Sequence, residues 1–448
     1  MTRRDHTKLP RASSAVRLGK ALCLGLVLGG CALGGGSPLT SMQAFSPAGR
    51  DAALAPSTPG TTAETSAVIA NLKSRSAILP DQGPYDQIAQ SVLAASRGRA
   101  EADLRVARLT AKARASNWLP QLSPQISLNS LGDLVSSLIV EQVLFDNGKK
   151  KAEREFAAAD VEVAAVSYAA EMNERVASGL THYIAARRAN EQGAAAQAAS
   201  LRLQEYDRIM RERVKGGLSD MSEARVISQK YAEMEATVRS DADSQRSALA
   251  QLNAMADRDL QGVAGMDQIA VSGRDATALS VVMAEAERGR SLAEAKILRA
   301  GYLPGLSAQG SVGSGKSDLG LTASVGNMLG FGTGDALAAI EASKASADAA
   351  VAEAQQTAEI KRVTLKQKLA AARAKYARDA EVTRQTGSGL EMFTEQYKVG
   401  RRTLLELVNM YESYAAMERA QIALKYDIAL LEIDIASELG LLADGTSI

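Results

Sequence analysis

Few side chains in this sequence have the types and spacing that catalysis or metal binding needs. There are two histidines, His6 near the N-terminus and His182 inside a long helical stretch. We find no nucleophile elbow, metal-ligand cluster or phosphate loop. The stretch Gly313-Ser314-Gly315-Lys316-Ser317 is superficially similar to a phosphate loop, but no strand-to-helix context accompanies it, and it is predicted to be a loop between strands. We therefore expect no enzyme activity, no cofactor and no bound metal.

The composition indicates long helices instead of a compact core of large side chains. The chain has 448 residues, of which 46% are hydrophobic but only 4% are aromatic, and alanine supplies the difference. Alanine combines the highest helix propensity with little bulk. Together with 23% charged residues, it predicts closely packed helices with one wet face.

The N-terminus is organised like an export signal. The apolar residues 21–28 follow a basic segment and lead into Gly29-Gly30-Cys31. Eight apolar residues are too few to span a bilayer, so residues 1–30 are predicted to be a signal peptide. The end of this segment is similar to a bacterial lipobox, which implies that Cys31 is the lipidated N-terminus. An ordinary signal peptide with an unrelated cysteine is the alternative.

Removal of residues 1–30 changes both the thiol content and the charge of the chain. Cys23 leaves with the signal, so no disulfide or thiolate metal site is expected. The mature chain has 46 Lys and Arg residues against 50 Asp and Glu residues, a formal net charge of −4. Binding to phosphates along a nucleic acid needs a cationic face, so nucleic acid is not an expected partner.

Three landmarks of the first half of the chain recur in the second half. The pairs are Trp118-Leu119-Pro120 with Tyr302-Leu303-Pro304, Phe145 with Phe331, and Gly216 with Gly400. The first and third pairs are 184 residues apart and the second is 186 residues apart. This order predicts a tandem duplication of roughly 185 residues.

The duplication divides the chain into segments. Residues 31–84 are rich in small and polar residues and predict a flexible tether, because this composition cannot bury enough surface to fold alone. The remaining segments are a first repeat over 85–262, a linker over 263–277, a second repeat over 278–442 and a tail over 443–448.

Helices dominate each predicted repeat. A first helix, over 86–117 or 278–300, ends before the Leu-Pro pair, since proline disfavours helix in the preceding residue. The proline-free stretches 147–215 and 335–399 predict helices roughly 100 Å long, too polar to lie in lipid. Kinks or breaks are expected at Gly193 and at Gly387 to Gly389. The return helices carry an apolar seven-residue pattern typical of antiparallel coiled-coil hairpins.

Alternating apolar and small polar residues predict two strand pairs. The strands are expected over 122–131, 138–145, 307–313 and 319–329. Strands of about ten residues with this alternation are typical of a transmembrane barrel. A half-buried sheet in a soluble domain has the same alternation, but the export signal favours the outer membrane.

These motifs together make the chain similar to the TolC-like outer membrane efflux family over residues 85–442. The resemblance is carried by the duplicated aromatic-Leu-Pro element, the stretch from Val140 to Gly148, and the Gly-x-x-Ser/Thr turns at Gly216 and Gly400. It implies a mainly α fold with a transmembrane β portion. Long antiparallel helical hairpins would form a periplasmic α-barrel, and four strands per protomer would join a 12-stranded β-barrel in a homotrimer.

The same resemblance assigns roles to the two helix–helix turns. A glycine in each turn permits left-handed backbone, and Ser219 or Thr403 can cap the next helix. The residues implied in docking a periplasmic adaptor protein are Gly216, Leu218, Ser219, Gly400 and Thr403. Three residues are implied in a periplasmic gate. Arg402 would act as a latch, Glu406 would be an acid of the constriction ring, and Asn409 stands where a second acid is expected.

The implied function is an export duct in the outer membrane. Its partners would be membrane lipid, the adaptor and, through the adaptor, an inner-membrane transporter. Type I protein secretion and small-molecule efflux share this scaffold, and we slightly favour type I secretion. The competing hypothesis is a periplasmic coiled-coil adaptor or scaffold lipoprotein without a channel. Adaptors, however, carry one helical hairpin, whereas this chain has two, each following a strand pair.

Overall fold

The computed structural model describes residues 66–96, 98–128, 134–271, 276–313 and 316–445. The chain divides into two units, Met1–Thr58 and Pro59–Ile448, and the first lies outside the described residues. The fold below is therefore that of the second unit. Cys31 and the predicted signal peptide also lie outside the described residues.

The elements follow the same order in both halves of the second unit. In the first half they are α2 (Pro84–Ala94), α3 (Arg99–Ala115), β1 (Gln121–Leu128), β2 (Leu134–Phe145), α4 (Lys149–Lys215) and α5 (Met221–Ala256). In the second half they are α6 (Leu279–Ala300), β3 (Pro304–Gly313), β4 (Lys316–Val325), α7 (Thr333–Lys398) and α8 (Leu404–Glu438). The predicted order of helix, strand pair, long helix and return helix is confirmed, whereas common descent of the halves stays a prediction.

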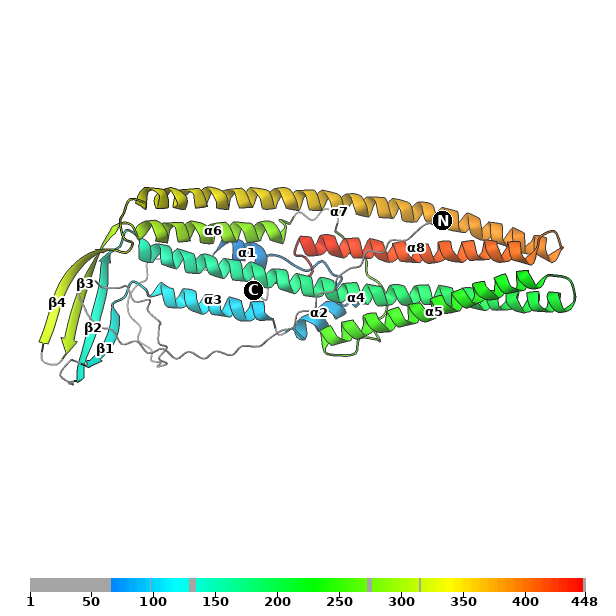
Figure 1. Cartoon of the computed structure of the whole chain (residues 1–448), viewed down its shortest axis with the longest axis horizontal. Helices are drawn as coiled ribbons and strands as arrows, with labels where there is room; N and C mark the ends of the chain where they lie inside the picture. The colour runs from blue at the N-terminus through cyan, green and yellow to red at the C-terminus, as the bar shows by residue number, and fades with distance from the viewer. Residues whose placement is uncertain (1–65, 97, 129–133, 272–275, 314–315, 446–448) are drawn as a thin grey trace, which may run out of the picture. The chain divides into compact units, whose positions relative to one another are not determined.

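The helices pack side by side along their lengths (Figure 1). The long helix α4 contacts α3 and α5 on one side and α6 and α8 on the other. The second long helix, α7, contacts α6 and α8. No helix among the described residues has an 18-residue stretch apolar enough to cross a bilayer.

Both long helices are continuous, so the predicted breaks at the glycines are wrong. Helix α4 runs for 67 residues through Gly193, and α7 runs for 66 residues through Gly387 and Gly389. A Cβ on Gly389 would lie 2.9 Å from the Met410 side chain, and one on Gly387 would lie 3.3 Å from that of Tyr414. Gly387 and Gly389 therefore allow α7 and α8 to approach closely, and the predicted kinks stay a prediction.

Two predicted boundaries near the start of the unit need correction. The helix expected over 86–117 is interrupted after Ala94, and α3 begins at Arg99 after Gly98. Residues 66–84, assigned to the flexible tether, contain α1 (Ala67–Lys73), whose Ile69 and Leu72 are buried. A few well-spaced apolar residues are enough to fix this segment, although its overall composition is polar.

The buried guanidinium of Arg75 joins three parts of the chain that are far apart in sequence. It donates to the carbonyl oxygens of Leu439 at 2.7 Å and Thr277 at 2.9 Å, and to Oδ1 of Asn71. The Gly445 amide in turn donates to the Arg75 carbonyl at 3.0 Å. The segment after α1, the end of α8 and the linker between the halves thus meet at one residue.

The four strands form one antiparallel sheet with the order β1-β2-β3-β4. Leu122 pairs with Val140, Val140 with Gly310, and Gly310 with Leu319, so one register line crosses all four strands. Gly313 pairs with Lys316, which places the phosphate-loop-like stretch in the β3–β4 hairpin. The strand pairs agree with the prediction, although β4 ends at Val325 instead of residue 329.

Candidate functional site

The two helix–helix turns lie together at the end of the unit opposite the sheet (Figure 1). They join α4 to α5 and α7 to α8. The predicted docking and gate residues lie on these turns and on the first two turns of α8. The structure therefore brings together residues that are almost 190 positions apart in sequence, between Gly216 and Thr403.

In the first turn, α4 ends in a Schellman-type arrangement. Gly217 has a φ of 70°, and the amide of the next residue, Leu218, donates to the Arg213 carbonyl at 2.8 Å. Gly216, which sequence comparison aligned with Gly400, has a φ of −80° and is not left-handed. The residue equivalent to Gly400 is therefore Gly217, one position later than expected.

Capping of the next helix is also shifted by one residue in the first turn. Asp220 is the N-cap of α5, and its Oδ1 accepts from the Ser222 amide at 2.6 Å. This bond lowers the pKa of Asp220 below its ordinary value. Ser219 is not the cap: its hydroxyl accepts from Nε of Arg213 at 3.1 Å and so ties the turn to the end of α4.

The second turn has the predicted cap. Gly400 has a φ of 72°, and the Arg401 amide donates to the Gln396 carbonyl at 2.8 Å. The Thr403 hydroxyl accepts from the Glu406 amide at 3.2 Å, while Oε2 of Glu406 accepts from the Thr403 amide at 2.9 Å. This reciprocal capping box satisfies two amides that helix geometry would leave without partners.

The predicted gate residues surround this capping box. Arg402 stacks over the Phe393 ring at 4.6 Å, and its guanidinium donates to Gln396 and to Oε1 of Glu406, both at 3.1 Å. Both carboxylate oxygens of Glu406 are thus engaged within its own chain, whereas Asn409 is exposed. These contacts fix Arg402 and Glu406 at the start of α8, and the role of all three residues in a gate stays a prediction.

The cap residues give a direct test of this geometry. Thr403→Ala removes the N-cap of α8 and should cost about 1 kcal/mol of local helix stability. Amide hydrogen exchange over residues 404–407 should then accelerate about fivefold. Ser219→Ala is the matched control, since Ser219 is not a cap, and residues 221–224 should exchange as in the wild type. Equal acceleration in both variants would contradict the assignment of Asp220 as the cap of α5.

The same turn should respond to acid. Hydrogen bonds from the Thr403 backbone, and then from Arg402 and the Thr403 hydroxyl, hold the pKa of Glu406 below its ordinary value. Because the pKa is lowered, ionised Glu406 stabilises the folded turn at pH values above the ordinary glutamate pKa of about 4.3. This stabilisation is lost as the pH falls through the pKa of the folded state. The protection of the turn amides, measured against unstructured chain at the same pH, should therefore decrease below about pH 4.3. Glu406→Gln should remove that dependence, and an unchanged pH profile in this variant would refute it.

One hydrophobic cluster joins the two hairpins behind the turns. Its buried members include Leu203 and Met210 of α4, Ile227 of α5, and Leu407 and Val408 of α8. The Tyr206 and Tyr411 rings meet edge to face with centroids 5.9 Å apart, and Lys230 forms an ion pair with Glu412. The two turns are therefore held by one packed unit.

Apolar side chains point into solvent at the turns themselves. Leu218 and Val399 are 70% and 69% exposed, and neighbouring Met221 is 57% exposed. Leu218 belongs to the first turn and Val399 to the second. Each turn therefore presents an exposed apolar side chain to the solvent.

Further from the turns, sequence reasoning missed a row of ion pairs between α8 and the first hairpin. Arg419 pairs with Asp241 at 2.5 Å, Lys425 with Glu191 at 2.8 Å, and Asp427 with Arg188 at 2.9 Å. Arg419 and Asp241 are only 19% and 13% exposed. From the sequence alone these residues are interpreted as solvated helix faces. The ion pairs are not visible there because the partners lie about 180 to 240 positions apart along the chain.

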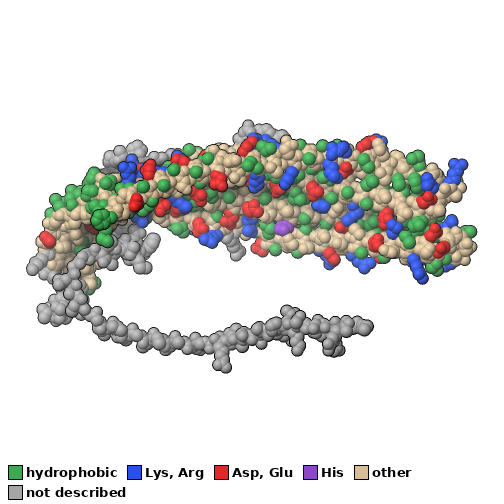
Figure 2. All heavy atoms as spheres, turned by 45° about the horizontal axis from the view of Figure 1, so that its top comes forward, with side chains coloured by type: hydrophobic (Ala, Val, Ile, Leu, Met, Phe, Trp, Pro, Cys, Tyr) green, Lys and Arg blue, Asp and Glu red, His purple; other side chains and the backbone are tan. Residues whose placement is uncertain are grey.

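At the opposite end, the register of the sheet separates its two faces. Residues directly opposite in an antiparallel pair share a face. One face therefore carries Leu122, Ile126, Leu138, Val140, Leu306, Val312, Leu319 and Leu321. The other carries mainly polar residues, such as Gln125, Gln309 and Thr322. Leu319 and Leu321 are 83% and 72% exposed, and Figure 2 shows hydrophobic side chains gathered over the strands.

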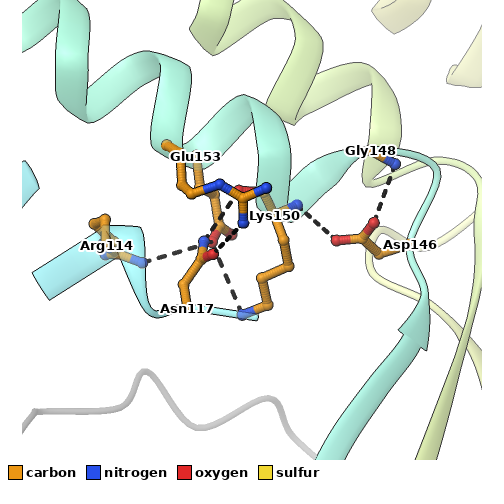
Figure 3. A network of polar contacts seen from close by, with 7 residues as sticks. Arg114, Asn117, Asp146, Gly148, Lys150 and Glu153 are labelled. Carbon is orange, nitrogen blue, oxygen red and sulfur yellow. Dashed lines mark hydrogen bonds and ion pairs between the residues drawn. The ribbon is translucent and has the colours of Figure 1, made fainter. Parts of the chain in front are cut away.

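A polar network fastens the sheet to the helices (Figure 3). Nδ2 of Asn117 donates to the Lys150 carbonyl at 3.1 Å and to Oε2 of Glu153 at 2.9 Å. The Asp146 carboxylate accepts from the amides of Gly148 at 3.0 Å and Lys150 at 2.6 Å. The end of α3, the end of β2 and the start of α4 are thereby held in one arrangement.

A four-stranded sheet with one apolar face, two long helices with shorter neighbours, and paired turns at the far end define the class: this is the fold of TolC-like outer membrane channels. The outer membrane protein VceC of Vibrio cholerae has 17% sequence identity and a TM-score of 0.69, covering 80% of this chain and 96% of VceC. A membrane protein of Pseudomonas aeruginosa has 15% identity and a TM-score of 0.72, covering 88% of this chain and 98% of its own.

A third similar structure is the CmeC outer membrane channel of Campylobacter jejuni. It has 15% identity and a TM-score of 0.68, covering 80% of this chain and 86% of CmeC. At such identities the likeness shows the fold, and the predicted resemblance is confirmed at that level. No protein-family model and no curated protein matches the sequence. Among the described residues, no group of three or more His, Cys, Asp or Glu side chains is placed to hold a metal ion.

Proposed function

We propose that the chain is the outer-membrane duct of a tripartite export system and acts as a homotrimer. The observation that carries this proposal is the exposed apolar face that crosses all four strands. In water such a face would be costly, whereas in a bilayer it matches the lipid. The fold shared with outer membrane channels of other bacteria supports the same conclusion.

The edges of the sheet support assembly into a ring. β1 and β4 are the outer strands and run in opposite directions, because three antiparallel pairings separate them. The free edge of β1 can therefore pair with β4 of the next copy, which satisfies the backbone groups that lipid cannot. Two copies would form a barrel of about eight strands, and side chains would fill its interior. Three copies would form a wider barrel with room for water inside.

The second long helix also supports contact between copies. Of the 66 residues of α7, only Ile340, Ala358, Leu365 and Leu369 are buried in the single chain. Several of its apolar residues, including Ile360, Val363 and Met392, are exposed by 46 to 62%. A neighbouring copy packed along α7 would cover these side chains.

The turns are the proposed contact with a periplasmic adaptor. Leu218 and Val399 offer apolar contacts, and the rigid turns built on Gly217 and Gly400 present them. Arg402, Glu406 and Asn409 on the same end would form the gate, and the adaptor would link the duct to an inner-membrane pump. Because the pump would select the cargo, the proposal covers both secreted proteins and small molecules. It also includes lipid anchoring through Cys31.

The decisive experiment uses the purified mature protein. We expect it to fractionate with the outer membrane, to run as a heat-labile trimer on gels, and to conduct ions in discrete steps across a planar bilayer. A scaffold or adaptor would instead remain a monomer or fractionate with the inner membrane. A soluble monomer without conductance would refute the duct.

A further inference from the structure

A group of exposed aromatic side chains lies where the strands meet the helices. Trp118 precedes β1, Phe145 ends β2, and Phe331 precedes α7; their exposures are 60%, 58% and essentially complete. Aromatic side chains at the border of an apolar surface mark the level of the lipid headgroups. If the proposed function holds, the first residues of the helices therefore lie at the headgroups on the side of the membrane that faces the helices.

Positive charge is concentrated at this level. We define the cationic band as Lys149, Lys150 and Lys151, which open α4, together with Arg114, Arg154 and Lys296 beside them. The carboxylates in contact with this group or with the start of α4 are Asp146, Glu153 and Glu155. Six cations thus face three carboxylates in each chain.

The carboxylates leave much of this charge unpaired. Asp146 is engaged with the amides of Gly148 and Lys150. Glu153 lies 3.7 Å from Arg114 and 3.8 Å from Lys150, so one carboxylate serves two cations at long range. Glu155 is shared in the same way between Lys296 at 2.6 Å and Lys151 at 4.0 Å.

The position of the lysines is unfavourable for the helix alone. The first turn of a helix favours acidic residues, because the amide dipoles make it positive, yet the first turn of α4 contains none. The side chains of Arg114 and Lys151 remain 47% and 75% exposed. The lysine charges therefore do not stabilise the helix, but they are placed to attract an external anion.

We propose that the cationic band binds the anionic headgroups of phospholipids in the leaflet that faces the helices. The phosphate charge complements the surplus of Lys and Arg, and the acyl chains would lie against the adjoining apolar face of the sheet. The amides at the start of α4 are already bonded to Asp146, so the side chains make the contact. Free phosphate has the same charge chemistry and is the other source that the test must separate.

The test measures lipid retained by the purified full-length protein. Detergent-extracted protein is incubated with an equimolar mixture of phosphatidylglycerol and phosphatidylcholine, and native mass spectrometry counts the bound lipids. We expect a preference for phosphatidylglycerol that falls about fivefold or more in the variant Lys149→Gln/Lys150→Gln/Lys151→Gln. The matched control, Lys366→Gln/Lys368→Gln/Lys375→Gln on α7, loses the same charge away from the strands and should keep the preference.

Three outcomes would overturn the inference: no preference in the wild type, the same loss in both variants, or displacement of the lipid by millimolar inorganic phosphate, which would indicate a free-phosphate site. Conductance of each sample in planar bilayers separates this test from the test of the duct itself. Protein that conducts but shows no lipid preference refutes only the cationic band. Protein that never conducts refutes the proposed function.

Discussion

Gly400→Trp is expected to abolish export while the trimer still forms. Gly400 has a φ of 72°, so any side chain costs about 1–2 kcal/mol, a local penalty far from the strands that would hold the trimer. No described atom lies within 4 Å of the position that a Cβ would take. The indole ring would therefore project from the turn and block the proposed adaptor contact. Export is measured in cells as release of a fluorescent efflux substrate and as protein secreted into the medium.

Gly400→Asn is the matched control for the backbone. Asparagine tolerates left-handed backbone and is small, so export should continue in this variant. Loss of trimers in Gly400→Trp, seen on unheated gels, would show that the turn has only a structural role. Normal export in Gly400→Trp would place the adaptor contact elsewhere.

Leu321→Arg is expected to prevent assembly in the outer membrane. Leu321 is 72% exposed on the apolar face of the sheet. A cation on the lipid side of a barrel costs about 2–4 kcal/mol near the middle of the bilayer, and a trimer would bear this cost three times. The heat-labile trimer should disappear from the outer membrane fraction.

Thr322→Arg is the matched control for Leu321→Arg. Thr322 is the next residue of the same strand and lies on the polar face, which the proposal turns toward water. This variant should assemble normally and should change only the conductance. If both variants assemble, the apolar face does not contact lipid, and if neither does, β4 tolerates no long side chain on either face.

Much of the fold follows from local sequence patterns. The alternation that includes Leu319 and Leu321 gave both the strands and their faces, and the absence of proline gave the two long helices. The break after Ala94 was missed because Gly98 lies inside a run that is otherwise rich in helix formers. The break expected at Gly389 was wrong because a glycine that permits a close contact has the same sequence signal as one that breaks a helix.

The candidate site was predictable at the level of turns but not of single roles. Gly217 instead of Gly216 is left-handed, and a choice between adjacent glycines depends on where the helix ends. Asp220 displaced Ser219 as the cap for the same reason. The Arg419–Asp241 pair gave no sequence signal, since only the packing of the two hairpins brings these residues together.

The unpaired backbone of β1 and β4 has a genetic consequence. If each ring closes only through its neighbours, a subunit with a spoiled edge damages every ring that it enters. With equal synthesis of normal and defective subunits and random mixing, only about one ring in eight is wholly normal. Mutations in the outer strands should therefore be dominant. A mutation whose product never meets the other subunits should instead be recessive.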